Sequence, residues 1–170
     1  MIVLIFGLPG SGKSYFACRL ADFISADYIS SDKVRQEVLD KKLYSDQAKL
    51  LVYNEMVNHM IAAIKQNRNV VLDATFYKND IRNRFIQQTE TKNKIVFIEV
   101  LADEEVIRER LKTPRLESDA DFEVYKKIKE QWEPFPEPHL VLKSTNDNIK
   151  EMLDKAANYL YINNDKRTNQ

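Results

Sequence analysis

Short apolar runs alternate with longer stretches in which apolar side chains recur at every third or fourth position. The runs cover residues 2–6, 28–29, 70–72, 95–101 and 140–142. The first of them, IVLIF, is apolar without alternation, which is typical of a strand buried on both faces of a sheet. We therefore expect about five strands, with the first one inside the sheet.

The stretches between these runs carry the 3.6-residue period of amphipathic helices. In the first stretch, Phe16, Leu20 and Ile24 show the spacing. The same period recurs at residues 34–39, 50–64, 81–85, 106–111, 122–132 and 149–160. Strands that alternate with helices predict right-handed crossovers and a parallel sheet covered by helices on both faces. The sequence thus predicts the α/β fold class.

Composition limits the number of domains and the kinds of partner. The 170 residues suit one domain, which we expect over residues 1–162, followed by a polar tail over 163–170. Acidic and basic residues number 26 each, so no overall field draws the chain toward nucleic acid or a membrane. Cys18 is the only cysteine, and no apolar run is long enough for a signal peptide or a membrane span. These features predict a cytoplasmic protein without membrane contact or an obligate protein partner.

The first strand leads into a glycine-rich segment, GLPGSGKS, at residues 7–14. It fits the pattern GxxxxGK[ST] between a buried strand and a helix, which is the setting that a phosphate-binding P-loop requires. The chain has three glycines, and all of them lie in this segment. We expect the loop amides to surround the phosphates of ATP, Lys13 to reach the β and γ phosphates, and the Ser14 hydroxyl to bind Mg²⁺.

Other positions extend the expected nucleotide site. A loop after the fifth strand, at Thr145, is placed to reach the adenine in this architecture. The expected nucleotide-binding residues are Gly7, Pro9, Gly10, Ser11, Gly12, Lys13, Ser14, Tyr15, Arg108, Lys112 and Thr145.

The second strand is followed by Asp32 and Arg35, three residues apart on one face of a helix start. One interpretation is an N-cap with a surface ion pair, because Ser30, Ser31 and Asp32 can all cap a helix. The other is a general base that accepts the proton of an incoming hydroxyl, with an arginine that holds the substrate. The sequence leaves both open.

Asp73 ends the third apolar run and precedes Ala74 and Thr75. An apolar run that ends in aspartate is typical of a Walker B segment, in which the carboxylate holds Mg²⁺ or its water shell. The alternative is a turn or N-cap aspartate. Since the first three strands end at one sheet edge, we expect Lys13, Ser14, Asp32 and Asp73 to meet in one pocket.

A basic segment follows the fourth strand, with Arg108, Arg110, Lys112 and Arg115 within eight residues. Such a segment can close over bound phosphates as a lid, expected at about 108–122, and place a guanidinium against the transferred group. We take Arg108 and Arg115 as candidate catalytic residues. The alternative is a solvated helix face paired with neighbouring glutamates.

Several segments together resemble the polynucleotide-kinase-like and zeta-toxin-like P-loop kinases. The matching stretches are GLPGSGKS, SSDKVR, VVLDATF, RERLKTPR and SDADFEVYKKIKEQWEP. The resemblance implies a single-domain P-loop fold of the nucleoside-monophosphate-kinase-like type with a small helical lid. It also implies a catalytic aspartate at Asp32, a substrate-contacting Arg35, a supporting Asp73 and lid arginines between Arg108 and Arg115. The chain departs from the family where Lys112 and Pro114 interrupt the lid arginines.

Three functions remain as hypotheses. The first, placed narrowly ahead, is an ATP-dependent kinase for the 5′-hydroxyl of a nucleic acid, favoured by DxxR and DAT but not by the neutral charge. The second is a kinase for a small metabolite such as a nucleoside or a sugar, which suits the neutral charge. The third is a nucleotide-binding switch or ATPase module.

Overall fold

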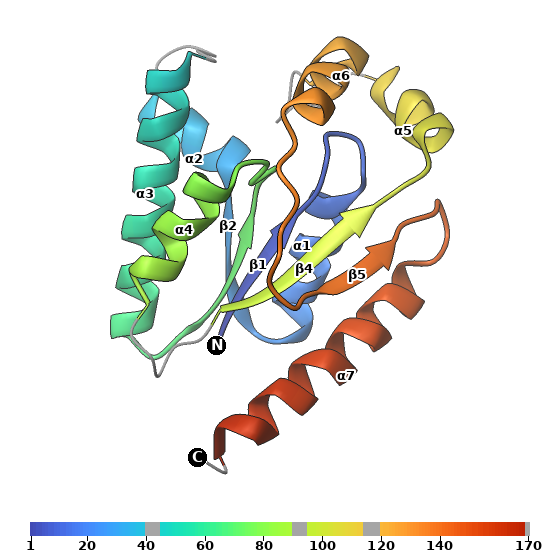
Figure 1. Cartoon of the computed structure of the whole chain (residues 1–170). Helices are drawn as coiled ribbons and strands as arrows, with labels where there is room; N and C mark the ends of the chain where they lie inside the picture. The colour runs from blue at the N-terminus through green and yellow to red at the C-terminus, as the bar shows by residue number, and fades with distance from the viewer. Residues whose placement is uncertain (40–44, 90–94, 114–119, 169–170) are drawn as a thin grey trace.

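The structure is a computed structural model, which describes residues 1–39, 45–89, 95–113 and 120–168, with side chains up to residue 161. Five strands in the described chain form one parallel sheet in the order β2-β3-β1-β4-β5 (Figure 1). They are β1 (Ile2–Phe6), β2 (Ala26–Ser30), β3 (Asn69–Asp73), β4 (Ile95–Leu101) and β5 (Leu140–Lys143). All five expected strands are therefore confirmed, and β1 lies at the centre of the sheet.

Helices connect the strands, as the periodicity predicts. They are α1 (Lys13–Phe23), α2 (Ser31–Val38), α3 (Asp46–Lys65), α4 (Asn79–Gln87), α5 (Glu104–Leu111), α6 (Phe122–Glu130) and α7 (Ile149–Thr168). Parallel pairing of β1 with both β3 and β4 requires such crossovers, because the chain must return to the same end of the sheet before each strand. The α/β fold class is confirmed.

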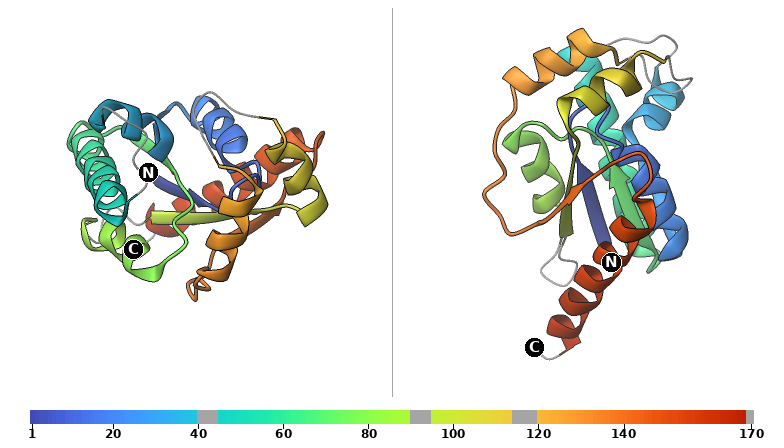
Figure 2. Two further views of the ribbon diagram at one scale, coloured as in Figure 1. Left: turned by 90° about the horizontal axis from the view of Figure 1, so that it is seen from above. Right: turned by 90° about the vertical axis from the view of Figure 1, so that its right-hand side faces the viewer.

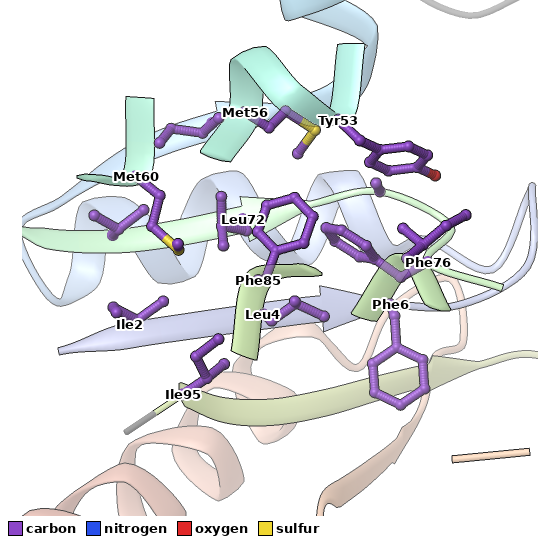
Figure 3. Packing of buried hydrophobic residues seen from close by; sticks show 14 of the residues in the cluster. Ile2, Leu4, Phe6, Tyr53, Met56, Met60, Leu72, Phe76, Phe85 and Ile95 are labelled. Atoms are coloured by element: carbon purple, nitrogen blue, oxygen red, sulfur yellow. The ribbon is translucent and has the colours of Figure 1, made fainter. Parts of the chain in front are cut away.

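Helices cover both faces of the sheet (Figure 2). Side chains of β1 alternate between the faces: Leu4 and Phe6 pack under α3 and α4, whereas Val3 and Ile5 pack under α1 and α7. Figure 3 shows the first of these cores, in which Met56 and Met60 of α3 and Phe85 of α4 lie over β1 and β3. The continuous apolar run of β1 is explained by this burial on two sides.

One expected boundary, that of the C-terminal tail, differs in the structure, and another, that of the lid, lies partly outside the described residues. Helix α7 continues to Thr168, so it runs into the segment expected as a polar tail, where no glycine or proline interrupts it. The expected lid, 108–122, contains residues 114–119, which lie outside the described residues. None of the helices within the described ranges has the length and apolar character needed to cross a lipid bilayer.

The carboxyl ends of the strands define one edge of the sheet. The P-loop, the start of α2, and helices α5 and α6 gather at this edge in Figure 1, and both chain termini lie at the opposite end. In parallel α/β sheets, ligands bind outside the carboxyl ends of the strands. The candidate site is therefore built from this edge.

Candidate nucleotide and phosphoryl-transfer site

The P-loop joins β1 directly to α1, as its sequence pattern predicts. The Ser11 amide donates to the Leu8 carbonyl over 3.1 Å, which closes the loop, and Gly12 is the N-cap of α1. No side chain caps this helix start, and its first turn carries no acidic residue. The amides of the first turn and the positive end of the helix dipole are therefore available to a phosphate.

Two of the loop glycines are required by close contacts. Gly12 has φ 92°, and a Cβ there would lie 2.7 Å from the Ser144 hydroxyl oxygen. A Cβ on Gly7 would collide with the carbonyl oxygen of Val100. The restriction of glycine to this loop thus has a steric origin: the loop is packed against the chain that leaves β4 and β5.

The start of α2 distinguishes between the two interpretations of Asp32. The helix is capped by Ser30, whose hydroxyl oxygen accepts from the Asp32 amide at 3.3 Å. The Asp32 carboxylate is therefore not the N-cap, and it lines the cavity described below together with Arg35. The N-cap of α2 is therefore Ser30 and not Asp32, and a catalytic role for Asp32 stays a prediction.

Asp73 at the end of β3 is almost completely buried, with 1% of its surface exposed. Its Oδ2 accepts a hydrogen bond of 2.7 Å from the phenol of Tyr28 on β2, whereas Oδ1 is buried with no hydrogen-bond partner among the described residues. Helix α4 begins only at Asn79, so Asp73 caps no helix. A buried carboxylate oxygen without a partner has lost its hydration, which favours a role in binding a cation or a donor group.

One cavity of about 340 Å³ collects the residues expected at this edge. Lys13, Ser14, Asp32 and Asp73 all line it, as the topology of the first three strands predicts, and Arg35 lines it with them. Its other lining residues are Pro9, Ser31, Lys49, Tyr53, Thr75, Tyr77, Ala120, Val124, Lys127 and Ile128. The cavity thus extends from the P-loop to the side chains of α3 and α6.

The chemistry of the donor set agrees with the expected Mg²⁺. The Ser14 hydroxyl and the unpartnered Oδ1 of Asp73 are hard oxygen donors that line the same cavity. Mg²⁺ is usually held by one or two protein oxygens together with substrate phosphates and water. The described residues contain no group of three or more acidic, histidine or cysteine side chains that could hold a metal by themselves. Ser14 and Asp73 therefore fit a metal that arrives with a nucleotide.

Arg110, in the middle of the basic segment, contacts the P-loop. Its Nη1 donates to the carbonyl oxygens of Gly10 and Ser11, over 3.3 and 3.1 Å. Its Nη2 donates to the Ser144 hydroxyl over 3.2 Å and to the Thr145 carbonyl over 2.7 Å. The guanidinium thus joins the P-loop to the loop after β5, on a side of the P-loop that does not line the cavity.

The other basic candidates lie elsewhere. Arg108 donates to Glu104 over 3.4 Å and stacks on the Phe122 ring, 3.9 Å from its centroid. Lys112 is exposed and pairs with Glu109. Neither lines the cavity in this structure, and Arg115 lies outside the described residues. A transfer role for Arg108 or Arg115 therefore stays a prediction.

Two further nucleotide candidates have local partners. Tyr15 is 55% exposed on α1, where the Arg19 guanidinium stacks on its ring. The Thr145 hydroxyl donates to Asp147 over 2.9 Å, and its backbone carbonyl is the acceptor for Arg110. Thr145 thus lies beside the P-loop through Arg110, in agreement with its expected position, whereas its contact with adenine stays a prediction.

A buried arginine, Arg82, holds the segment after β3 that lines the cavity. Arg82 is fully buried and donates to the carbonyls of Phe76 and Glu133, each over 2.6 Å, and to the Asn79 side chain over 2.7 Å. Phe76 has φ 44°, a strained conformation for a bulky residue. The backbone amide of Glu133 donates to the carbonyl of Tyr77 over 2.9 Å. This Arg82 clamp fixes residues 75–77 against the chain after α6.

Tyr53 of α3, which lines the cavity, has a phenol that stays protonated at neutral pH. Burial raises the pKa of Tyr53 to about 12, with the nearby Arg35 charge acting in the opposite direction. Tyr53 therefore remains a hydrogen-bond donor at neutral pH. Its ring packs 5.7 Å from the Phe76 ring, which links the cavity wall to the core (Figure 3).

Sequence reasoning missed several residues of this site. The sequence pattern places Tyr28 in a strand and predicts no role for it in the site. It marks Arg110 as part of the basic segment but not as a catalytic or nucleotide-binding residue. Lys49 and Tyr53 share one face of α3 through their four-residue spacing, which is a signal that could have found them. Val124, Lys127 and Ile128 fall in a segment that carries the family resemblance, although no single residue in it was selected.

The fold and site together define the class of protein: a parallel α/β domain whose central strand enters a phosphate loop is a P-loop nucleotide-binding domain. The chain belongs to the family described as AAA domain (AAA_33), whose model matches residues 2–135. Uncharacterized protein Rv2004c of Mycobacterium tuberculosis and uncharacterized protein Mb2027c of Mycobacterium bovis are each 32% identical over 87 residues. These matches span 44% of this chain but only 18% of each relative.

Solved structures show the same fold at low identity. A sugar kinase from Janibacter superposes with a TM-score of 0.73 at 14% identity, covering 95% of this chain and 94% of its own. A gluconokinase from Sinorhizobium meliloti gives 0.69 at 15% identity, covering 95% of each chain. The APS kinase CysC of Mycobacterium tuberculosis, in complex with AMPPNP and APS, gives 0.70 at 15% identity, covering 94% and 96%. These structures share the fold of this chain over nearly their whole length.

Proposed function

We propose that this chain is an ATP-dependent phosphotransferase that moves the γ-phosphoryl group of ATP to a hydroxyl of a small acceptor. The observation that carries the proposal is the single cavity that Lys13, Ser14, Asp32, Arg35 and Asp73 line together. P-loop kinases need these functions side by side: a phosphate cradle, a metal position, a carboxylate for the acceptor hydroxyl and a cation to place it. The kinase names of the structural neighbours support the same class of reaction.

In this mechanism the P-loop amides and Lys13 hold the β and γ phosphates. Asp32 orients the acceptor hydroxyl and accepts its proton as the acceptor oxygen bonds to the γ phosphorus. The bond between that phosphorus and the bridging oxygen breaks, and ADP leaves. Arg35 holds the acceptor beside the transferred group. Ser14 and Asp73 would hold Mg²⁺, which supplies charge neutralisation at the phosphate oxygens.

A small acceptor is favoured over the nucleic acid 5′ end by the shape of the cavity. Beyond the transfer residues it is lined by Tyr53, Tyr77, Val124 and Ile128, from α3, the chain after β3, and α6. A volume of about 340 Å³ is at the lower end of small-molecule sites. A long polyanion needs a continuous basic track, which the zero net charge does not supply by itself.

The nucleic acid end stays as a second candidate because of Lys33 and Arg35. Lys33 is exposed at the start of α2, where its Nζ lies 5.0 Å from the centroid of the Tyr28 ring. Arg35 lines the cavity one helical turn from Asp32. A terminal nucleotide could enter the cavity while the next phosphate rests on these two side chains.

The test is transfer of label from γ-labelled ATP with Mg²⁺ to small hydroxylated acceptors and to a 5′-hydroxyl oligonucleotide. We expect transfer to a small acceptor, reduced by a factor of about 10² to 10⁴ in Asp32→Asn, because a general base contributes that much. Glu37→Gln, on the exposed face of the same helix, is the matched control. Transfer only to the oligonucleotide would select the second candidate. ATP hydrolysis that no acceptor stimulates would reject both in favour of a switch module.

A further inference from the structure

The part of the cavity that α3 and α6 line, called the far end below, carries one lysine from each helix. Lys49 comes from α3 and Lys127 from α6, and both line the cavity with the apolar side chains Val124 and Ile128. Neither lysine belongs to the P-loop or to the DxxR segment. Under the proposed function, an acceptor whose hydroxyl reaches Asp32 would share one cavity with these two lysines.

The charges that line the cavity are unequally distributed. Among the described residues, four basic side chains line it but only two carboxylates do, and both carboxylates, Asp32 and Asp73, follow β2 and β3 at the phosphate end. Lys13 and Arg35 are also at that end. Among the described residues, no acidic side chain lines the cavity beside Lys49 or Lys127. The far end therefore has an excess of positive charge.

The contacts of the two lysines leave this charge available. Lys49 pairs with Asp46 at 3.5 Å, but the Asp46 side chain is fully exposed, and such a surface pair is weak. Within the described chain, Lys127 forms no ion pair, whereas its neighbours on α6 do: Lys126 with Glu123 and Lys129 with Glu104. Of the three lysines on α6, the one that lines the cavity is thus the one that forms no ion pair with the described residues.

These lysines are not needed for the nucleotide. The P-loop supplies its own cation in Lys13, and the opposite side of the loop is occupied by Arg110, Ser144 and Thr145, none of which lines the cavity. A neutral polyol would give two ammonium groups no counter-charge. Carboxylate and phosphate oxygens form charge-assisted bonds with lysine that are shorter and about twice as strong as neutral ones.

We propose that the acceptor carries, besides the hydroxyl that receives the phosphoryl group, a carboxylate or phosphate group that Lys49 and Lys127 bind. Tyr53, Tyr77, Val124 and Ile128 contact the short carbon skeleton between the two groups. The inference rests on the proposed function for the identity of the hydroxyl end. The anion site itself depends only on the cavity and its two lysines.

The first experiment probes the anion site with inorganic phosphate and acetate. The full chain is labelled with carbon-13 at the lysine side chains and saturated with Mg²⁺ and the non-hydrolysable analogue AMP-PNP, so that the P-loop is occupied. We expect saturable shifts of the Lys49 and Lys127 signals. Lys126 on α6 and the exposed Lys65 at the end of α3 are matched controls. Shifts at Lys49 and Lys127 no larger than at the controls would overturn the inference.

The second experiment compares transfer to pairs of acceptors in which a carboxylate or phosphate takes the place of one terminal hydroxyl group while the other hydroxyls are retained: glycerate with glycerol, gluconate with glucitol, and ribose 5-phosphate with ribose. We expect the anionic member to be preferred. Lys49→Ala and Lys127→Ala should each raise its KM about tenfold with little change in kcat, and Lys→Arg should restore much of the loss. The arginine variants separate the charge from a packing role.

The outcomes distinguish the two proposals. Transfer to neutral and anionic acceptors alike, unaffected by either lysine substitution, would overturn the anion site and leave the phosphotransferase. Saturable phosphate or acetate binding at Lys49 and Lys127 without transfer to any acceptor would support the anion site and count against the phosphotransferase.

Discussion

The phenol of Tyr28 donates a hydrogen bond of 2.7 Å to Oδ2 of Asp73, across the neighbouring strands β2 and β3. Burial raises the pKa of Tyr28, and the charge of Asp73 raises it further. The phenol is therefore a permanent donor in the neutral range. One carboxylate oxygen is fixed by this bond, while the other, Oδ1, is buried without a partner among the described residues.

Replacement of Tyr28 by phenylalanine should weaken magnesium-dependent nucleotide binding. Without its donor, the Asp73 carboxylate can rotate, so we expect the Mg²⁺ concentration for half-maximal ATP binding to rise by about three- to tenfold. The free energy of unfolding should fall by about 1–2 kcal/mol, because a buried acceptor is left unsatisfied. Calorimetric titration of ATP at several Mg²⁺ concentrations measures the first effect, and urea unfolding measures the second.

Tyr161→Phe is the control for this change, since Tyr161 is 68% exposed. It should alter neither quantity. If Tyr28→Phe lowered stability but left the Mg²⁺ dependence unchanged, Tyr28 would be a packing residue that does not position Asp73.

Arg82→Ala should destabilise the fold strongly. The change leaves the buried carbonyl of Phe76 and the partly buried carbonyl of Glu133 without their donor and opens a cavity beside Phe6 and Trp132. We expect a loss of about 3–5 kcal/mol in the free energy of unfolding, measured by urea denaturation. Arg84→Ala, at an exposed position of the same helix, should change stability by less than about 0.5 kcal/mol. Similar losses in both variants would contradict the clamp.

Arg110→Ala should weaken nucleotide binding more than Arg108→Ala. Arg110 donates to two P-loop carbonyls and to the loop after β5, whereas Arg108 contacts Glu104 and the Phe122 ring. We expect the Kd for ATP to rise about tenfold in the first variant, which corresponds to the loss of one or two hydrogen bonds to a charged group. Equal effects of the two variants on the Kd would show that both arginines reach the nucleotide in the bound state.

The contact of α5 with α6 should depend on pH. A hydrogen bond from Lys129, together with its charge, lowers the pKa of Glu104, and Tyr125 and Arg108 add smaller effects. A carboxylate whose pKa is lower in the folded state stabilises the fold above its unfolded pKa of about 4.3, and this contribution is lost as the pH falls through the folded value.

Glu104→Gln should therefore lower the thermal midpoint at pH 7, and its difference from the natural chain should vanish in strong acid. Differential scanning calorimetry between pH 7 and pH 3 measures both chains. Glu105→Gln, an exposed change in the same first turn of α5, is the control. A difference that did not decrease at all between pH 7 and pH 3 would assign the effect to helix propensity and not to the charge of Glu104.

The architecture could be predicted because it depends on local patterns. The five apolar runs are the five strands, and the order of elements allows few ways to build a parallel sheet. The buried face of α3 was harder to predict. The helical period at residues 50–64 begins at Leu50, which is 40% exposed, whereas Ala48 and Met56 are buried. In a helix of 20 residues with apolar side chains on several faces, tertiary packing decides which face is covered.

The site was predictable where a motif fixes residue types by chemistry, as in the P-loop, Asp32 and Asp73. It was not predictable where the contact joins distant segments. Tyr28 reaches Asp73 across 45 positions, and Arg110 reaches Gly10 across 100. No local pattern marks such pairs, because their proximity follows from the strand order and not from their spacing in the chain.

The Arg82 clamp also determines where this chain can bend. Helix α6 leads through a short connection to Glu133, which is tied to Arg82 and to Tyr77, so its carboxyl end is anchored to the base of the cavity. Any swing of α6 toward the P-loop must therefore pivot close to Glu133. Such a pivot would move Lys127 and Val124 across the cavity, whereas the residues that the Arg82 clamp holds would keep their position. The width of the acceptor site would then depend on the position of α6 relative to residues 75–77, which the Arg82 clamp holds in place.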